Sequence, residues 1–376
     1  MTRARALAVL SGIFSVGIAV GLALSGLRAP EAVPQWHETT ALSASRTYAQ
    51  AIGLATGEVL VVGGMDRDPA TRTYSHAEII DPRTGSTTPD PAARIARMWQ
   101  TLTTLRSDLV LVVDGTERLP DGWHALAYAE TFDPWSHTWR TVRAPTYARS
   151  DHSAVLLNDG RVLVIGGNDG PKWITPSEIY DPLTDRWSKA APLPVGRTRF
   201  TAVTLPDGRV LVAGGLLQPG PATDTTLMYD PATDAWSDGP RMRARRAIYA
   251  AVTLPNRDVL FIGGQEDGSN SAERYDVRTQ EFVYAGTLAS PRMYGQAAVL
   301  DDGTVVYAGG IGIPARGFAT TTDVERWDPR TNLWTASAPL NVGRAGGAVV
   351  AIAGGVYLIG GSADLDRPIS SVELLR

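Results

Sequence analysis

Paired glycines recur along the chain about every fifty residues, and this repeat constrains the fold more than any other feature. Each pair closes a short apolar run such as RVLVIGG or DVLFIGG. The pairs are Gly63-Gly64, Gly166-Gly167, Gly214-Gly215, Gly263-Gly264, Gly309-Gly310 and Gly360-Gly361. The interval between Gly64 and Gly166 is twice the period, and within it the run LVLVVDG ends in Asp114-Gly115. We interpret this run as a degenerate seventh copy, so the chain is predicted to consist of seven equivalent units.

Each unit is predicted to contain four strands. The apolar run is rich in Val, Leu and Ile, as in strands covered on both faces, and turn residues such as Asp207-Gly208 precede it. A second motif follows the glycine pair and reads SEIYDPLTDRW from Ser177 to Trp187. Its Asp-Pro step favours a tight turn between two further strands. These patterns predict an all-β fold of short strands joined by turns rich in glycine and proline.

The two ends of the repeat region are complementary. After Gly361 the last copy reaches its third strand, Ser371 to Arg376, and has no fourth. The segment QWHETTAL begins at Gln35 and places Trp36 where a fourth-strand aromatic is expected. We therefore expect the N-terminal strand to complete the C-terminal unit, because this pairs two strand edges that would otherwise be exposed. The predicted fold is a seven-bladed β-propeller.

The glycine pair, an aromatic residue before the Asp and a Trp six positions after that Asp resemble the kelch repeat. The resemblance extends from Gln35 to Arg376, and seven such units are similar to the propeller of the galactose oxidase family. It implies the fold and is silent on the ligand. Galactose oxidases hold copper with two tyrosines and two histidines, and one of the tyrosines is cross-linked to a cysteine. This chain has no cysteine, and we expect neither a copper oxidase nor a metal or other cofactor, because the five histidines are scattered without metal-ligand spacing: His37, His76, His124, His137 and His152.

Residues 1–34 are predicted to lie outside the propeller, which comprises residues 35–376. An uncharged stretch runs from Ala6 to Leu27, with two arginines before it and prolines after it. Its length favours an uncleaved membrane-anchoring helix, whereas small residues near Ala23 suit a signal peptidase, so a cleaved signal peptide remains the alternative. In both cases we expect the propeller to be extracytoplasmic, because the arginines stay in the cytoplasm. The net charge of −4 argues against nucleic-acid binding, and we expect a monomeric propeller.

A second periodic residue is an arginine that lies 17 or 18 residues before the second glycine of each pair. The seven are Arg46, Arg97, Arg149, Arg197, Arg246, Arg292 and Arg344. They lie just ahead of the first strand, so we expect them to circle one mouth of the central channel, where they could bind an anion or a carboxylate. In six units, however, a glutamate opens the third strand and could pair with the arginine; these are Glu78, Glu130, Glu178, Glu273, Glu325 and Glu373. We favour this structural interpretation, because buried charges need partners and a scaffold needs them in every repeat.

Residues outside the repeat consensus are better candidates for ligand binding. The loops after the glycine pairs differ most between units, and two of them, Met65 to His76 and Ile311 to Asp323, are long. The candidate binding residues are Asp114, Glu117, Trp123, Trp173, Trp99, Tyr249 and Tyr294. Aromatic platforms with polar neighbours suit sugar rings or peptide side chains, although such aromatics can also simply pack over the ends of the strands. Asp151 and His152 resemble part of a catalytic pair, but no serine partner is indicated.

Two functions are compatible with these patterns. The favoured one is a non-catalytic recognition module that binds a polypeptide or a glycan through the loops around the channel mouth. The alternative is a carbohydrate-acting enzyme that resembles the kelch-type sialic acid epimerases, in which an arginine would hold a carboxylate and Asp114 or Glu117 would act as the acid. Pairing of the arginines with the glutamates would argue against both the anion ring and this enzyme.

Overall fold

The computed structural model describes residues 34–66, 76–90, 95–119, 121–218, 220–313, 318–352, 354–364 and 367–376. The predicted signal peptide or anchoring helix lies outside these residues, as do parts of the two long loops. The chain divides into two units, Met1–Pro34 and Gln35–Arg376, and the fold described below is that of the second. Within the described residues, no helix is long and apolar enough to cross a membrane.

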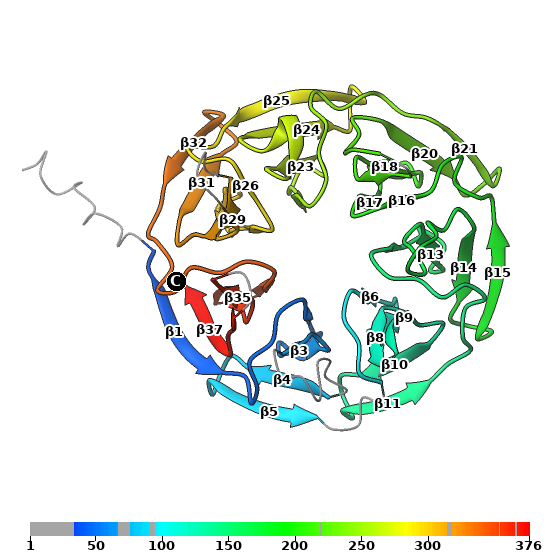
Figure 1. The fold of residues 1–376 in the computed structure, drawn as a ribbon, viewed down its shortest axis with the longest axis horizontal. Helices are drawn as coiled ribbons and strands as arrows, with labels where there is room; N and C mark the ends of the chain where they lie inside the picture. The colour runs from blue at the N-terminus through cyan, green and yellow to red at the C-terminus, as the bar shows by residue number, and fades with distance from the viewer. Residues whose placement is uncertain are drawn as a thin grey trace, which may run out of the picture. The chain divides into compact units, whose positions relative to one another are not determined.

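The described residues of Gln35–Arg376 form a ring of seven four-stranded sheets, which we number 1 to 7 in chain order (Figure 1). All pairings are antiparallel, and the prediction of an all-β fold is confirmed. From the centre outwards, sheet 1 contains β2 (Gln50–Gly53), β3 (Val59–Val62), β4 (Ala77–Asp81) and β5 (Ser86–Asp90), and sheet 2 contains β6 (Thr101–Thr104), β7 (Val110–Val113), β10 (Ala129–Asp133) and β11 (Thr138–Thr141). In the same order, sheet 3 contains β12 (Ser153–Leu156), β13 (Val162–Ile165), β14 (Ser177–Asp181) and β15 (Arg186–Ala190); sheet 4 contains β17 (Thr201–Thr204), β18 (Val210–Ala213), β20 (Thr226–Asp230) and β21 (Ala235–Asp238); and sheet 5 contains β22 (Ala250–Thr253), β23 (Val259–Ile262), β24 (Ser271–Asp276) and β25 (Glu281–Thr287). Sheet 6 contains β27 (Gln296–Val299), β28 (Val305–Ala308), β31 (Val324–Asp328) and β32 (Leu333–Ala336), and sheet 7 contains β33 (Ala348–Ile352), β34 (Gly355–Ile359), β37 (Ser371–Leu375) and β1 (Trp36–Ala41).

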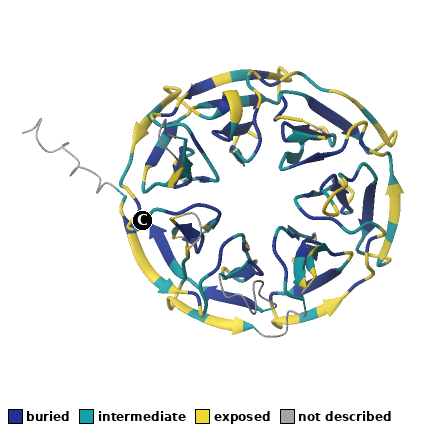
Figure 2. Cartoon of the chain, viewed as in Figure 1, coloured by how far each residue is buried: buried dark blue, intermediate teal, exposed yellow. Residues whose placement is uncertain are grey.

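The second strand of each sheet is the most deeply buried, which explains the apolar runs in the sequence. All four residues of β13 are buried, whereas the outer strand β15 contains only exposed and half-buried residues. Figure 2 shows the same contrast around the ring. Apolar clusters fill the space between neighbouring sheets; Leu163 of sheet 3, for example, belongs to one cluster with Val212 and Tyr229 of sheet 4. The core is therefore divided among the interfaces between sheets.

Sheet 7 contains strands from both ends of the described chain. Strand β1 pairs with β37, from Trp36 opposite Leu375 to Ala41 opposite Ser371, beside the C-terminus (Figure 1). The Trp36 side chain is buried in a cluster with Val306 of sheet 6. The N-terminal strand β1 is therefore the outer strand of sheet 7, and it pairs with the edge of β37 that would otherwise be exposed.

One edge of the ring carries the glycine pairs, and we call it the mouth edge. The first strands begin and the second strands end there, while the hairpin turns between them lie at the opposite edge. Short elements lie after the glycine pairs or just ahead of the first strands, and they make the loops of the mouth edge unequal. They are the hairpin of β8 (Thr116–Leu119) and β9 (Gly122–Ala125), the pair of β16 (Arg197–Thr198) and β19 (Leu216–Leu217), the group of β26 (Arg292–Met293), β29 (Ile311–Gly312) and β30 (Ala319–Thr320), the pair of β35 (Ser362–Ala363) and β36 (Arg367–Pro368), and the 3-10 helix η2 (Glu266–Gly268).

Candidate functional site

The seven periodic arginines form a buried collar near the mouth edge. We call them the arginine collar, and none is more than 2% exposed: Arg46, Arg97, Arg149, Arg197, Arg246, Arg292 and Arg344. Their side chains bond to their own sheet; Arg149 Nη1, for example, donates to Gly166 O at 3.0 Å. Their carbonyls accept the N–H of the second glycine of the preceding sheet, as in Gly115 N–H to Arg149 O at 3.0 Å and Gly361 N–H to Arg46 O at 2.9 Å. The collar therefore connects neighbouring sheets, including sheet 7 to sheet 1.

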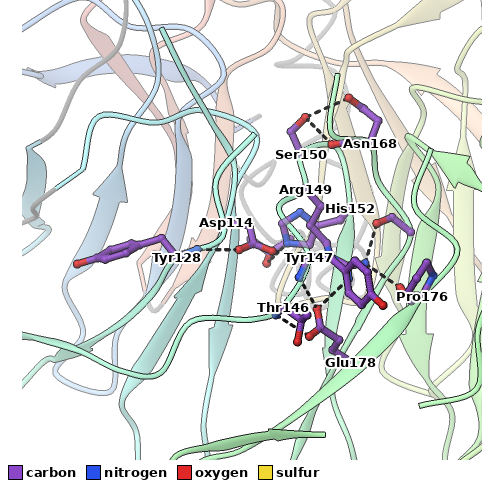
Figure 3. A network of polar contacts seen from close by, with 12 residues as sticks. Asp114, Tyr128, Thr146, Tyr147, Arg149, Ser150, His152, Asn168, Pro176 and Glu178 are labelled. Atoms are coloured by element: carbon purple, nitrogen blue, oxygen red, sulfur yellow. Dashed lines mark hydrogen bonds and ion pairs between the residues drawn. The ribbon is translucent and has the colours of Figure 1, made fainter. Parts of the chain in front are cut away.

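Six collar arginines in the described residues pair with the glutamate near the start of the third strand. The pairs are Arg46–Glu78, Arg97–Glu130, Arg149–Glu178, Arg246–Glu273, Arg292–Glu325 and Arg344–Glu373. In sheet 3, the Glu178 carboxylate lies 3.0 Å from Arg149 Nη2 and accepts the Thr146 N–H at 2.7 Å (Figure 3). Because each of these charges has a buried partner, the contacts favour a structural role for the collar over anion binding.

Asp114 takes the place of the first glycine of the pair in sheet 2. Its φ of 53° lies in the left-handed region that the glycine of this position adopts in other sheets. The side chain is fully buried; Oδ1 accepts the Tyr128 N–H at 3.1 Å, and Oδ2 lies 3.8 Å from Arg149 Nε (Figure 3). Burial raises the pKa of Asp114 well above its usual value, although Arg149 opposes the shift. Asp114 is therefore a buried neighbour of the collar and presents no surface to a ligand.

Three further candidates lie on loops of the mouth edge. Glu117 and Trp123 are on the β8–β9 hairpin, where Trp123 is 39% exposed and its ring lies 5.4 Å from the Arg118 guanidinium. Trp173 is half-buried in a loop of sheet 3, and its backbone N–H donates to Gln218 Oε1 at 3.3 Å. None of these residues lines the central cavity described next.

A second ring of residues follows the collar by two positions in every sheet. All seven have a positive φ, between 52° and 63°, and we call them the mouth ring: Tyr48, Trp99, Asp151, Arg199, Ile248, Tyr294 and Gly346. Backbone hydrogen bonds join ring neighbours, for example Tyr48 N–H to Gly346 O at 2.9 Å and Arg199 N–H to Asp151 O at 3.3 Å. A left-handed conformation costs a residue other than glycine about 1–2 kcal/mol. The same left-handed backbone is thus present in each sheet, strained in the six whose residue is not glycine, while the side chain changes from sheet to sheet.

The mouth ring encloses a cavity of about 310 Å³. All seven mouth-ring residues line it, together with side chains of the first strands such as Gln50, Thr201 and Gln296. Because every sheet contributes to the lining, the cavity lies at the centre of the ring. Its volume is at the lower end of the range for small-molecule sites, which suits a single ring-sized group.

The cavity has a charged part and an aromatic part. Arg199 donates from Nε to Asp151 Oδ2 at 3.4 Å and from Nη1 to the Tyr294 hydroxyl at 3.3 Å. The centroid of the Tyr48 ring lies 5.6 Å from that of Trp99 and 6.1 Å from that of Tyr294. The lining therefore offers aromatic faces beside a fixed guanidinium and a carboxylate.

Burial changes the acid–base properties of this lining. It raises the pKa of Asp151, although Arg199 opposes the shift. It also raises the pKa values of Tyr48 and Tyr294, so both hydroxyls stay protonated at neutral pH. Burial acts to lower the pKa of Arg199, but Asp151 and Tyr294 outweigh it and the pKa is raised. The guanidinium consequently remains charged.

Three of the predicted candidates, Trp99, Tyr249 and Tyr294, come together in this cavity. Trp99 and Tyr294 belong to the mouth ring, whereas Tyr249 is part of the wall. Its hydroxyl donates to Ala213 O at 2.6 Å and accepts the Thr201 N–H at 3.0 Å. Burial raises the pKa of Tyr249 to about 12, so this hydroxyl stays protonated, and its two hydrogen bonds hold it in the wall.

Asp151 and His152, adjacent in sequence, do not act as a pair. His152 Nε2 lies 2.9 Å from Thr101 Oγ1, and burial lowers the pKa of this imidazole to about 3, so it stays neutral. Asp151 bonds instead to Arg199.

Sequence reasoning did not identify Tyr48, Arg199 or Ile248, and it considered Asp151 only beside His152. The signal that could have found them is positional. When the seven copies are aligned on the collar arginine, the second residue after it is Tyr, Trp, Asp, Arg, Ile, Tyr and Gly in turn. This position varies from copy to copy, although the arginine two positions before it is constant.

The donor set at the mouth does not fit copper. The chain has no cysteine, and no histidine is among the described residues that line the cavity. Within the described ranges of the chain, no three His, Cys, Asp or Glu side chains are grouped so that they could hold a metal ion. A tyrosine–cysteine cross-link cannot form in this chain.

Comparison with known proteins agrees with the fold. The Kelch motif family model matches residues 148–194 and 197–243, which contain sheets 3 and 4. No curated protein matches the sequence. A solved structure of a fungal alcohol oxidase of the AA5 family, in complex with copper, is similar with a TM-score of 0.73 at 17% sequence identity; the match covers 91% of this chain and 76% of that chain.

The Kelch motif matches, the ring of sheets and the similarity to the oxidase structure support a fold like that of kelch β-propellers. The fold is similar to that of the galactose oxidase family, as the sequence motifs predicted. At this level of identity the likeness concerns the fold alone.

Proposed function

We propose that sheets 1 to 7 are the seven blades of a closed propeller, and that this propeller is an extracytoplasmic recognition module that binds a glycan at its mouth. The observation that carries the proposal is the central cavity, to which every sheet contributes one mouth-ring residue. A scaffold needs no such variation, because the collar already connects the sheets. Different side chains on one repeated backbone are what recognition of an asymmetric ligand requires.

The chemistry of the lining supports a sugar. The faces of Tyr48, Trp99 and Tyr294 can stack against the apolar face of a sugar ring, while Arg199 and Asp151 can bond to its hydroxyls. The volume of about 310 Å³ suits one sugar unit and not a folded protein surface. A polypeptide ligand, which kelch repeats commonly take, would have to present a single side chain or terminus to this cavity.

Binding of glycans to an array tests the proposal, with the full-length chain in non-ionic detergent. Trp99→Ala is expected to weaken binding at least about tenfold, the loss typical of an aromatic side chain at the centre of a binding site. Trp123→Ala is the matched control, because Trp123 is exposed on the β8–β9 hairpin and does not line the cavity. Loss of binding in Trp123→Ala with retention in Trp99→Ala would move the site to the hairpin. Binding of peptides but no glycan would replace the proposed ligand.

We further propose that residues 1–34 export the chain and that the propeller is monomeric. The Gln35 N–H donates to Arg376 O at 3.0 Å, at the edge opposite the mouth, so an anchor before Gln35 would join the ring away from the cavity. Because the chain has no cysteine, Leu183→Cys introduces a single thiol at a position that is 94% exposed. Labelling of this thiol in intact cells by a membrane-impermeant maleimide is expected. Labelling only after lysis would place the propeller in the cytoplasm.

A carbohydrate-acting enzyme is the second candidate, and Asp151 is the observation that favours it. Its carboxyl lines the cavity with a side chain that is 15% exposed, and its raised pKa suits a group that gives and takes a proton. NMR spectra of the best array ligand, recorded over time with the protein, would show whether the sugar is converted. Conversion that is abolished in Asp151→Asn would support this candidate, and an unchanged spectrum of a bound ligand would remove it.

A further inference from the structure

The arginine collar has one exception, and it lies in sheet 4. Among the described residues, Arg197 is the collar arginine without a glutamate partner. Its guanidinium donates to Gly214 O at 2.9 Å, to Thr225 O at 3.1 Å and to Thr225 Oγ1 at 3.2 Å, all of which are neutral groups. Arg197 is only 2% exposed, and burial lowers its pKa to about 10. The group is therefore still charged at neutral pH.

Two further residues of sheet 4 explain the missing carboxylate. In five other sheets, the residue three positions before the collar arginine donates its N–H to the glutamate; the donors are Ser43, Thr146, Arg243, Ala289 and Asn341. In sheet 4 this position is Pro194, which has no N–H. The glutamate position is occupied by Leu227, which pairs with Val212 as Glu178 pairs with Val164 in sheet 3. Sheet 4 has thus lost the carboxylate together with its backbone donor.

An uncompensated buried charge is costly, so its presence needs an explanation. Positions that break a structural rule kept elsewhere in a protein are commonly functional. Arg197 lies two residues before Arg199, which is the only lysine, arginine or histidine among the described residues that line the cavity. The charge of Arg197 also acts on Tyr249, another lining residue. The departure from the repeat therefore lies beside the cavity.

The charges of Arg197, Arg199 and Asp151 sum to a net positive charge near the mouth. Asp151 is the only acid among the described lining residues, and it is already bonded to Arg199. Arg197 adds a second positive charge that has no carboxylate partner in the described part of the chain. Arg199 thus lines the cavity beside Asp151, while Arg197, which is buried and is not a lining residue, adds an unpaired positive charge in the same sheet.

Arg199 retains the capacity to donate into the cavity. Its Nε and Nη1 bond to Asp151 and Tyr294, whereas Nη2 has no hydrogen bond to any described residue. The side chain is 32% exposed, so a ligand can reach it. A guanidinium with a free terminal nitrogen is suited to a carboxylate, which accepts charge-assisted hydrogen bonds.

We propose, building on the glycan-binding function above, that the sugar bound at the mouth carries a carboxylate. The carboxylate binds Arg199, and the sugar ring lies against Tyr48, Trp99 and Tyr294. The unpaired charge of Arg197 selects a sugar acid over the neutral sugar of the same shape.

Oligosaccharides that end in D-glucuronate or in D-glucose test this proposal, because the two sugars differ only in a carboxylate and a hydroxymethyl group. The full-length chain in non-ionic detergent is expected to bind the glucuronate series at least about tenfold more tightly. The variant Pro194→Ser/Leu227→Glu restores the donor and carboxylate that Ser43 and Glu78 provide in sheet 1. It leaves Arg199 in place and is expected to reduce the preference roughly threefold or more, because it neutralises Arg197.

The control is Pro194→Ser/Leu227→Gln, which has the same shape without the charge and is expected to keep the preference. Arg199→Gln, a change at a partly exposed side chain, is expected to abolish the preference even if the double variants fold poorly. Equal binding of both sugar series would overturn the carboxylate and leave glycan binding intact, whereas no binding in the wider glycan array would overturn the proposed function itself. A preference that survives in folded Pro194→Ser/Leu227→Glu would overturn the role of Arg197.

Discussion

Each mouth-ring residue is the second residue after a collar arginine, yet the arginine collar and the mouth ring differ in almost every respect. The collar repeats one residue in all seven sheets, is buried, and satisfies its charges within the scaffold in six of them. The mouth ring repeats a backbone conformation, lines a cavity, and has a different side chain in nearly every sheet. The comparison explains how the proposed recognition site could arise within a repeat. Constant residues hold the backbone, and the neighbouring position is free to vary.

The largest effect is expected when a collar pair is broken. Arg149→Met should lower the free energy of unfolding by about 3–5 kcal/mol, because Glu178 would remain buried without its partner. Arg197→Met should cost less, about 1–3 kcal/mol, because it leaves only backbone and hydroxyl acceptors unpaired. Urea unfolding of both variants measures the difference. Equal losses would contradict the distinction between sheet 4 and the other sheets.

A smaller, pH-dependent effect is expected at Asp114, where the collar meets the irregular sheet 2. Burial raises the pKa of this carboxyl in the folded state, so the folded chain holds the proton more tightly than the unfolded chain. Stability contributed by the protonated group is present at low pH and is lost as the pH rises from about the usual Asp value towards the folded pKa. Melting temperatures of the wild type and Asp114→Asn between pH 4 and 8 test this: the wild type should lose stability relative to the variant as the pH rises.

Asp133 provides the control of opposite sign. The Trp135 N–H lowers the pKa of this half-buried residue's carboxyl, so any stability it contributes is lost as the pH falls. The prediction for Asp114 would be wrong if the wild type became more stable relative to Asp114→Asn as the pH rises. That result would mean that Arg149 keeps Asp114 ionised in the folded state.

The smallest effect on stability is expected in the mouth ring. Ile248 has a φ of 56°, which a β-branched residue rarely adopts. Ile248→Gly relieves strain of about 1–2 kcal/mol and loses a comparable amount of apolar burial, so we expect a net change within about 1 kcal/mol. Val252→Gly, four residues on in β22, has no such strain to relieve and should cost about 2 kcal/mol or more. Equal losses in urea unfolding would contradict the strained conformation.

Much of the fold could be predicted from the sequence because its determinants are periodic. The glycine pairs, apolar runs and Asp-Pro turns repeat at fixed spacing, and each has a local physical cause. The kelch-type fold and the all-β content were predicted in this way and are confirmed. Trp36 indicated where an outer strand belongs, and β1 lies there beside β37.

The site was harder to predict because it depends on conformation and on exceptions. A positive φ at Tyr48, Trp99 or Ile248 is invisible in the sequence, since these residues do not favour it. Trp99 and Tyr294 were identified as aromatics, but their partner Arg199 was one arginine among many. Pro194 and Leu227 carry no signal singly. Their meaning depends on the missing glutamate partner of Arg197, which only the contacts of the other sheets reveal.

A crystal structure of the full-length chain with the best ligand from the glycan array would test the central claim most directly. We expect the sugar to lie in the central cavity, with a carboxylate oxygen within hydrogen-bonding distance of Arg199 and the sugar ring facing Trp99. A ligand bound at Trp123 on the β8–β9 hairpin, or at Trp173, with the cavity unoccupied, would contradict it.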